Sequence, residues 1–455
     1  MKDTVDPCPL RTGDAYSAPR AYPVVGHLPF FVRDKLGFLL RCAESYPDVV
    51  KLRIGAPTYL LTNPQDISYV LRDNERNYEK SPRIIGGKRK SLFGKALIAT
   101  PSDSHRSKRH ALQPLFQRKA IEQFADAVIS RAEQMLARWQ HGVELDIAQE
   151  MLSVSQQIIV KTIFGSDCGE QAETLCNLLE IRRHHIEHVL GSVCPFSEYL
   201  PSRLNNQYRR ATKQFDEIIF RMIKEQRGNA DPARDIFSML MRTRYDDGTT
   251  LSDEEIRDET LTLALAGYET ISQALTWTWY LLSQNPKEES RLLSELHTVL
   301  SGRMPLVSDL QNLPYTAMVF SESLRLYPPT WLFVRIAQRD DALPSGAAIT
   351  GGSKIYLSPF ITQRNPRYFP NPERFIPERF SEDAKRSRPK FAYFPFGGGP
   401  RQCIGEGFAT MEGMLLIASI ASRFKLELSE GQQVMLEAGI TLRPRNGLIM
   451  RLQQR

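Results

Sequence analysis

The segment Phe396-Gly-Gly-Gly-Pro-Arg-Gln-Cys-Ile-Gly405 is the most informative stretch of the chain, because it sets one cysteine, Cys403, in a glycine-rich loop. Glycine tolerates positive φ and close backbone approach, so amides can point at the sulfur and a flat cofactor can lie against the loop. The apolar run from Phe408 to Ile420 predicts a helix directly afterwards, and a helix N-terminus stabilises an anionic thiolate. Arg401 offers a cation for an anionic group. The segment therefore predicts a thiolate that binds a metal.

Five positions of this segment fit the pattern F-x-x-G-x-R-x-C-x-G: Phe396, Gly399, Arg401, Cys403 and Gly405. Through this pattern the chain resembles the cytochrome P-450 superfamily of haem-thiolate monooxygenases. The alternative, a buried free cysteine in a glycine turn, describes most single cysteines but not this many fixed positions in so short a segment. The resemblance implies that Cys403 ligates the iron of haem b (iron protoporphyrin IX). It also implies that Phe396, Arg401 and Gly405 contact the haem.

Two further segments resemble the structural elements of the family. Phe320-Ser-Glu-Ser-Leu-Arg-Leu-Tyr-Pro-Pro329 carries an E-x-x-R pair on one face of a helix that the two prolines end, and Phe375-Ile-Pro-Glu-Arg-Phe380 carries P-E-R-F. An isolated pair of this kind is usually a surface salt bridge of small value. The resemblance implies instead that Glu322, Arg325 and Arg379 form a structural triad with no catalytic role.

The apolar stretch from Leu261 to Leu282 contains no proline and has the length of a membrane span. Glu269 and Gln273 lie in its middle, where charged and polar groups are costly in a bilayer. The stretch therefore predicts a long buried helix.

Ala266-Gly-Tyr-Glu-Thr270 within this helix resembles the family's distal-helix motif, A/G-G-x-D/E-T. The resemblance implies that Ala266 and Gly267 leave room beside the haem for oxygen, and that Glu269 and Thr270 are catalytic and manage protons. Ile271 departs from the second hydroxyl residue that often follows in the family. Without the cysteine loop, a threonine in mid-helix would be read as bonded to a backbone carbonyl.

A basic segment, Asp103-Ser-His-Arg-Ser-Lys-Arg-His-Ala-Leu-Gln-Pro114, stands where the family places W-x-x-x-R. His105 replaces the tryptophan and can still donate a hydrogen bond, although an exposed polar histidine is the alternative. Arg335 occupies the family's position for another propionate contact. The resemblance implies a clamp on the anionic groups of the haem, formed by His105, Arg109, Arg335 and Arg401.

Length and composition predict one large compact domain over residues 1–455, since no linker, repeat or low-complexity tract interrupts the chain. The segment Met1–Leu10 carries acids and prolines where a signal peptide or anchor needs an apolar run. Cysteines at positions 8, 42, 168, 176, 194 and 403 show no paired spacing. These observations predict a cytoplasmic protein with no membrane anchor, and a monomer is expected.

The formal net charge of +7 is mild for 455 residues. The densest basic cluster, Arg106 to His110, has no aromatic interleaving, which argues against nucleic-acid binding. It favours a docking face, with Arg106, Lys108 and Arg109, for an acidic electron donor: a ferredoxin or flavodoxin with its reductase. The run Arg182 to His188 places two histidines four residues apart but lacks the H-E-x-x-H order of a metal site, so a solvated helix face is preferred.

The predicted fold class is mainly α (α+β), a large helical body with small peripheral β-sheets, as in the cytochrome P-450 fold. Residues 21–100 are expected to alternate loops with short strands, including Val49 to Ile54 and Thr58 to Leu61. Residues 102–328 are expected to be almost wholly helical. Strands are expected again at Ala348 to Leu357 and Leu426 to Leu452, with a turn at Thr441 to Gly447.

The resemblance implies a monooxygenase that inserts one oxygen atom from O2 into a C–H or C=C bond of a hydrophobic substrate, by hydroxylation or epoxidation. Natural-product, terpenoid or fatty-acid tailoring in secondary metabolism is expected, with electrons from separate redox proteins. Family position gives the pocket candidates, apolar apart from one threonine: Ile85, Leu97, Ile98, Leu263, Ala266, Thr330, Trp331, Leu332, Phe333 and Ile440.

Two functions from other classes share the cysteine loop. A haem-thiolate sensor or carrier needs no proton relay, so Glu269 and Thr270 count against it. An oxygen-independent isomerase or dehydratase shares the fold, but such members often lose the threonine, which is present here as Thr270. Products heavier by one oxygen atom would separate the monooxygenase from both.

Overall fold

The computed structural model describes residues 18–46, 48–85, 93–165, 171–191, 201–227 and 235–455. The segment Met1–Leu10 and the cysteines at 8, 168 and 194 lie outside these ranges. The described residues group into two compact units, and each unit combines stretches that lie far apart in the sequence. The expected single domain stays a prediction.

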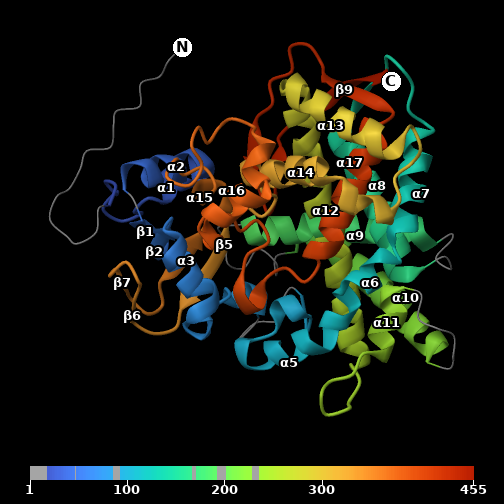
Figure 1. Cartoon of the computed structure of the whole chain (residues 1–455). Coiled ribbons are helices and arrows are strands. Elements are labelled where there is room, and N and C mark those ends of the chain that lie inside the picture. Colours follow the sequence, from blue (N-terminus) through green and yellow to red (C-terminus); the bar gives the residue numbers. More distant parts are fainter. Residues whose placement is uncertain (1–17, 47, 86–92, 166–170, 192–200, 228–234) are drawn as a thin grey trace. The chain divides into compact units, whose positions relative to one another are not determined.

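The first unit comprises the described residues up to Ser81 together with Thr330–Arg374 and Glu382–Cys403. Among its described residues, five strands form a sheet in the order β1-β2-β8-β5-β3, and β6 pairs with β7 (Figure 1). The strands are β1 (Val49–Ile54), β2 (Ala56–Leu61), β3 (Tyr78–Glu79), β5 (Phe333–Ala337), β6 (Asp341–Ala342), β7 (Ala348–Ile349) and β8 (Lys354–Leu357).

The sheet follows from alternating side chains on β1, where Leu52 and Ile54 are buried while Lys51 and Arg53 are exposed. β2 pairs with β1 in the antiparallel sense and with β8 in the parallel sense. β5 then pairs antiparallel with β8, with Arg335 opposite Ile355. A strand from late in the chain is thereby fixed against the N-terminal hairpin.

The helices of the first unit surround this sheet and are short: α1 (Leu28–Arg33), α2 (Lys35–Ser45), α3 (Pro64–Ser68), η1 (Tyr69–Asp73), η2 (Glu75–Asn77), α15 (Pro359–Thr362), α16 (Glu382–Ser387), η9 (Lys390–Ala392) and η10 (Gly399–Arg401). The expectation of loops and strands before residue 100 is wrong for α1 and α2. Pro29 lies in the first turn of α1, where its missing N–H costs nothing, and the Asp34 side chain caps α2 by accepting from the Gly37 N–H at 2.9 Å.

The second unit comprises the described residues of 82–329 with Phe375–Ser381 and Ile404–Arg455. It is mostly helical (Figure 1). The helices are α4 (Pro82–Ile85), η3 (Leu97–Ala99), α5 (Ser102–Leu112), η4 (Gln113–Phe116), α6 (Arg118–Glu122), α7 (Ala125–Leu136), α8 (Ile147–Phe164), α9 (Gln171–Gly191), α10 (Arg203–Gln226), α11 (Ile236–Arg242), α12 (Asp253–Gln284), α13 (Pro286–Leu300), η7 (Val307–Asn312), α14 (Pro314–Leu326), η8 (Pro377–Phe380) and α17 (Glu406–Ala421).

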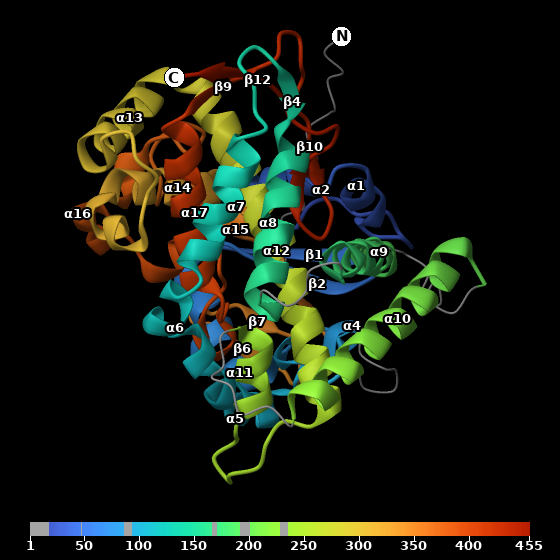
Figure 2. The ribbon, with the colours of Figure 1, turned by 90° about the vertical axis from the view of Figure 1, so that its right-hand side faces the viewer.

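Helix α12 is the long buried helix that the sequence predicts. The Ser252 side chain and Glu255 form a capping box at its N-terminus, and acids in the first turn complement the helix dipole. Most of its residues are buried, and it packs along α8, as Figure 2 shows. Pro286 begins α13 directly after its end. Within the ranges that the structure describes, no helix has both the length and the apolarity to cross a membrane.

The strands of the second unit are β4 (Glu144–Asp146), β9 (Phe424–Leu428), β10 (Leu436–Ala438), β11 (Leu442–Pro444) and β12 (Ile449–Gln454). They form a sheet in the order β4-β12-β9 and the hairpin β10-β11. The expected strands late in the chain are confirmed. The turn expected at Thr441 to Gly447 is wrong over its first half, where β11 pairs with β10; Ile440 lies in the connection between them.

Candidate functional site

The cysteine loop belongs to the first unit. Gly397 and Gly399 have φ of +73° and +67°, which L-residues rarely adopt, so the backbone turns twice within three residues. The Cys403 N–H donates to the Phe396 carbonyl at 2.9 Å and closes the loop. Cys403 is exposed, and Cys403, Cys42 and Cys176 all lie outside disulfide bonds. The loop thus holds the backbone of one accessible thiol in a fixed position.

Gly399 is the glycine that packing requires most. A Cβ at this position would lie 1.9 Å from the carbonyl oxygen of Leu71. We expect Gly399→Ala to cost at least about 1–3 kcal/mol of folding free energy and to lower the haem bound per protein, because strain and a backbone clash coincide. Thermal melting and haem absorbance measure both effects.

Gly346→Ala is the matched control, because Gly346 has a φ of +84° in the same unit with no neighbouring atom within 4 Å of its added Cβ. It should show strain alone. Equal losses in the two variants would contradict a packing role for Gly399.

A buried cation, Arg335, and two half-buried ones, Lys80 and Arg401, lie together in the first unit. Arg401 pairs with Glu79 at 2.9 Å. Burial, and repulsion from Arg401, lower the pKa of Arg335 to about 10. Burial, with repulsion from Arg335 and Arg401, holds the pKa of Lys80 well below its usual value. The three cationic side chains thus lie close enough to repel one another, and Glu79 and Glu75 are the carboxylates that oppose this repulsion. The cluster fits the carboxylates of a cofactor, and Lys80 is a member that the motifs did not predict.

The remaining members of the predicted clamp lie on α5 of the second unit. His105 is buried rather than exposed, and Arg109 is half-buried one turn further on. Lys108, expected on a docking face, is also buried: its Nζ lies 3.0 Å from Glu255 Oε1 and 2.5 Å from the Lys95 carbonyl oxygen. That part of the docking-face prediction is wrong, because acids of α12 neutralise the lysine; Arg106 is exposed as expected.

The distal motif lies in the middle of α12, in the second unit. Thr270 is half-buried, and its Oγ1 donates to the Ala266 carbonyl at 2.8 Å. Ala266 is exposed. A Cβ at Gly267 would lie 2.6 Å from Ile159 Cδ1 on α8, so this glycine lets the two helices approach closely. The motif thus combines a hydroxyl on an accessible face with a tight helix contact behind it.

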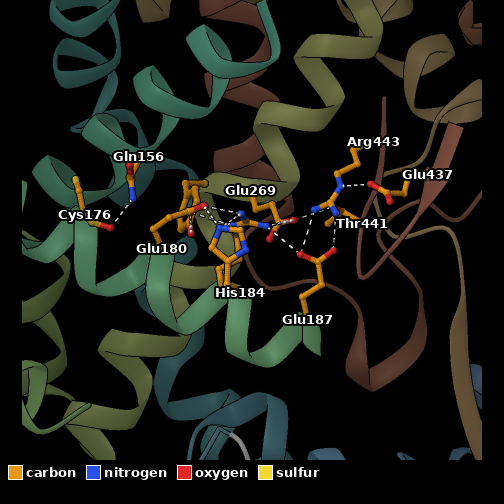
Figure 3. Close-up of polar contacts among 11 residues, drawn as sticks. Gln156, Cys176, Glu180, His184, Glu187, Glu269, Glu437, Thr441 and Arg443 are labelled. Carbon is orange, nitrogen blue, oxygen red and sulfur yellow. Dashed lines mark hydrogen bonds and ion pairs between the residues drawn. The ribbon is translucent and has the colours of Figure 1, made fainter. Parts of the chain in front are cut away.

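Glu269 lies beside Thr270 in sequence but takes part in a different set of contacts (Figure 3). It is 8% exposed, accepts from Thr441 Oγ1 at 2.8 Å, and lies 3.7 Å from Arg183 Nη1. Burial raises the pKa of Glu269, while the Arg183 guanidinium and the Thr441 hydroxyl oppose the rise. A carboxyl of this kind can change protonation at a working pH closer to neutral than an exposed glutamate can.

The motifs did not indicate Arg183, Glu187 or Thr441. The interpretation of Arg182 to His188 as a solvated helix face is wrong in part: Arg182 and His185 are buried, and the His185 ring stacks on Tyr208 at 3.6 Å between centroids. Arg183 faces Glu269, while His184 and His188 are exposed as expected. Among the described residues, no His, Cys, Asp or Glu side chains cluster as a metal site would require.

The structural triad is assembled within the second unit. Arg325 donates from Nε to Glu322 Oε2 at 2.6 Å and from Nη2 to Oε1 at 2.8 Å, and both side chains are fully buried. Arg379, on η8, brings its Nε within 3.4 Å of Glu322 Oε1, and the Ile376 N–H donates to the same oxygen at 2.9 Å. Glu322 therefore joins α14 to the P-E-R-F segment.

The pocket candidates are divided between the units. In the first unit, Trp331 is buried, Thr330 and Leu332 are half-buried, and Phe333 packs on Phe394.

In the second unit, the Leu97 N–H donates to Glu259 Oε1 at 2.7 Å, which ties η3 to α12. Ile98 and Leu263 are half-buried, and Ile440 is exposed. Ile85 lines a cleft of about 690 Å³ whose walls carry charged side chains such as Lys95 and Glu255, so its apolar setting is not confirmed.

Known proteins resemble this chain along nearly its whole length. The family model for cytochrome P450 matches residues 17–450. Cyclooctatin synthase of Streptomyces melanosporofaciens is 33% identical over 92% of this chain and 91% of its own length. Pentalenene oxygenase of Streptomyces avermitilis is 31% identical over 97% of this chain and 98% of its own length.

Among solved structures, the retinoic acid-bound cyanobacterial CYP120A1 superposes with a TM-score of 0.85 at 24% identity, covering 96% of this chain and 98% of that one. This likeness shows the fold. With the family match along nearly the whole chain and relatives above 30% identity, it establishes that the chain belongs to the cytochrome P450 family, whose members are haem-iron monooxygenases.

Proposed function

We propose that this monooxygenase inserts one oxygen atom into a terpenoid. Cyclooctatin synthase and pentalenene oxygenase, which match more than nine-tenths of the chain, act on terpenoids. The apolar character of most pocket candidates supports a hydrophobic substrate of this kind. Hydroxylation and epoxidation are both compatible with these residues.

Cys403 is the residue that would ligate the iron of haem b, through Sγ. Arg335 and Arg401, with Lys80 beside them, would neutralise its propionates, and His105 and Arg109 would serve the same purpose from α5. The grouping of Arg335, Arg401 and Lys80, close enough to repel one another, supports this assignment. When bound, the haem supplies the activation of dioxygen.

The observation that carries the proposed oxygen insertion is a pair of groups suited to proton delivery: a buried carboxyl next to an accessible hydroxyl on one helix. Glu269 has a raised pKa because it is buried, so its carboxyl can take up a proton and release it again. Thr270 donates to the Ala266 carbonyl and can accept a hydrogen bond at the same oxygen. We infer that Glu269 supplies protons and that the Thr270 hydroxyl holds in place the final proton donor of the relay.

The function is tested by supplying the protein with a ferredoxin, its reductase, cyclic terpenes and isotopically labelled dioxygen. A product that is heavier by one labelled oxygen atom is expected. A product of unchanged mass formed without oxygen would favour an isomerase, and loss of water would favour a dehydratase. A ferredoxin or flavodoxin as the native electron donor, a cytoplasmic location and a monomeric state stay predictions.

Thr270→Ala should keep haem binding and substrate affinity but lower product formed per reducing equivalent by about 10²-fold, the lower end of what a positioned proton donor contributes. The electrons should appear as hydrogen peroxide instead. Product and peroxide are measured against cofactor oxidised in the same reaction.

Thr276→Ala is the matched control, because Thr276 makes the same backbone bond, to the Ser272 carbonyl at 2.7 Å, further along α12. It should leave the ratio of product to reducing equivalent unchanged, and Thr270→Ser should restore it. Unchanged coupling in Thr270→Ala would mean that the proton relay does not run past Thr270.

A further inference from the structure

A chain of charged side chains links Glu269 to two elements outside α12 (Figure 3). On α9, Arg183 lies 2.5 Å from Glu180 Oε1 and 3.3 Å from Glu187 Oε2. On the hairpin β10-β11, Arg443 lies 2.9 Å from Glu187 Oε1. Helix α9 therefore holds the guanidinium that faces Glu269 and is itself joined to the hairpin.

Thr441 connects Glu269 to the hairpin directly. It is buried, and its hydroxyl donates to Glu269 Oε1 at 2.8 Å. The next residue, Leu442, is anchored: its N–H donates to the Pro329 carbonyl and its carbonyl accepts from Trp277 Nε1, both at 2.9 Å. The preceding residue, Ile440, is 37% exposed. Thr441 thus stands between a fixed strand and an exposed residue that is a pocket candidate.

The connection between the strands also packs closely on α9. A Cβ at Gly439 would lie 2.8 Å from Glu187 Oε1, so the backbone passes directly over that carboxylate. A displacement of the connection therefore acts on Thr441 and Glu187 together. Both residues act on Glu269, one through a hydrogen bond and the other through Arg183.

The charged and hydrogen-bonding groups that face Glu269 come from α9 and the hairpin. Burial and the like charge of Glu187 raise the pKa of Glu269, whereas Arg183, Thr441 and Arg443 lower it. Arg183 has a pKa above its usual value because its carboxylate partners outweigh its burial, so it stays cationic. The protonation of Glu269 is thus controlled by groups that lie outside α12.

We propose that Arg183 and Thr441 are positioning residues for the Glu269 carboxylate, through which α9 and the hairpin that carries Ile440 control proton delivery. This rests on the proposed function, in which Glu269 supplies protons. A substrate that contacts Ile440 would then act on the relay through the adjacent Thr441. Neither positioning residue is required to touch the substrate or the haem.

The test uses the haem-loaded protein and the variants Arg183→Gln and Thr441→Val, with Arg183→Lys and Thr441→Ser as conservative partners. The infrared carboxyl band of Glu269, assigned by its loss in Glu269→Gln, is titrated with pH in the resting protein. Arg183 and Thr441 each lower the pKa of Glu269, so the loss of either group should raise that pKa. We expect the midpoint to rise by about one pH unit in Arg183→Gln and by a smaller amount in Thr441→Val.

The amount of product formed per reducing equivalent depends on pH, and this profile should move to higher pH by the same amounts. The direction is the same whether Glu269 controls the acidic or the alkaline side of the profile. Substrate affinity should stay unchanged. The conservative variants should restore both midpoints. Glu437→Gln is the matched control, because Glu437 accepts from Arg443 Nε at 2.8 Å on the same hairpin and is not one of the groups that act on the Glu269 carboxyl. It should move neither midpoint.

Band midpoints that stay at the wild-type pH in both variants would overturn the proposal, provided that Glu269→Gln itself uncouples the reaction; the proposed function would then stand. If Glu269→Gln couples normally, Glu269 is not the proton source, and that part of the proposed function fails together with the control assigned to Arg183 and Thr441. The two failures are therefore distinguished by one variant.

Discussion

Alanine in place of Cys403 is expected to abolish monooxygenase activity and to remove the spectral signature of thiolate ligation. The wild-type protein, reduced and exposed to carbon monoxide, should show the strongly red-shifted Soret band of a haem with a cysteine thiolate ligand. The thiolate pushes electron density toward the iron and favours cleavage of the O–O bond, which alanine cannot do. Difference spectroscopy and product formation measure both losses.

Two other cysteines of the described structure, Cys42 and Cys176, provide the controls. Cys42 is buried in α2 and Cys176 is half-buried in α9, and alanine at either position should leave the spectrum unchanged. Cys403→His should move the band to the position of imidazole ligation, which shows that the ligand has changed and that the fold is intact. A wild-type spectrum of imidazole type in folded protein would contradict the assignment of Cys403.

Local patterns predicted the parts of the fold that depend on local physics. Val49 to Ile54 alternates buried and exposed side chains, and β1 has these bounds. The apolar stretch Leu261 to Leu282 lies within α12, whose ends are set by a capping box and a following proline. Helices α1 and α2 lie where loops and short strands were expected, and Pro29 stands at a position in α1 where a helix tolerates proline.

Long-range contacts account for the errors at the site. The basic run around Lys108 suggests an exposed side chain. In the structure Lys108 is buried and pairs with Glu255 and Glu259, which lie about 150 positions later in the chain. Burial raises the pKa of Glu259 to about 7, and the contact with Lys108 opposes that rise.

Arg183 looks like part of a solvated face, yet it meets Glu269 of a helix that follows much later in the chain. The cysteine loop was predictable because its function depends on a short contiguous segment. The surroundings of Glu269 were not, because α9, α12 and the β10-β11 hairpin each contribute one part.

Glu322→Ala should produce the largest loss of stability among the variants considered. It removes the carboxylate that pairs with Arg325, and both side chains have no exposed surface. Leaving a buried guanidinium without its carboxylate costs about 3–5 kcal/mol. The Ile376 N–H also loses its acceptor, so the link from α14 to η8 should fail. Urea unfolding monitored by circular dichroism, together with the haem bound per protein, measures the effect.

Glu382→Ala is the matched control, because Glu382 and Lys385 form a pair with the same i,i+3 spacing, 3.0 Å apart, with side chains 76% and 46% exposed. An exposed pair contributes about 0–1 kcal/mol, so this variant should unfold almost as the wild type does. The two variants separate the effect of burial on stability from the effect of i,i+3 spacing, since the Glu322–Arg325 and Glu382–Lys385 pairs differ mainly in their exposure to water. If both variants lost stability equally, the E-x-x-R pair would act as an ordinary surface salt bridge, and the joining of α14 to the P-E-R-F segment would have to depend on Arg379 and the backbone alone.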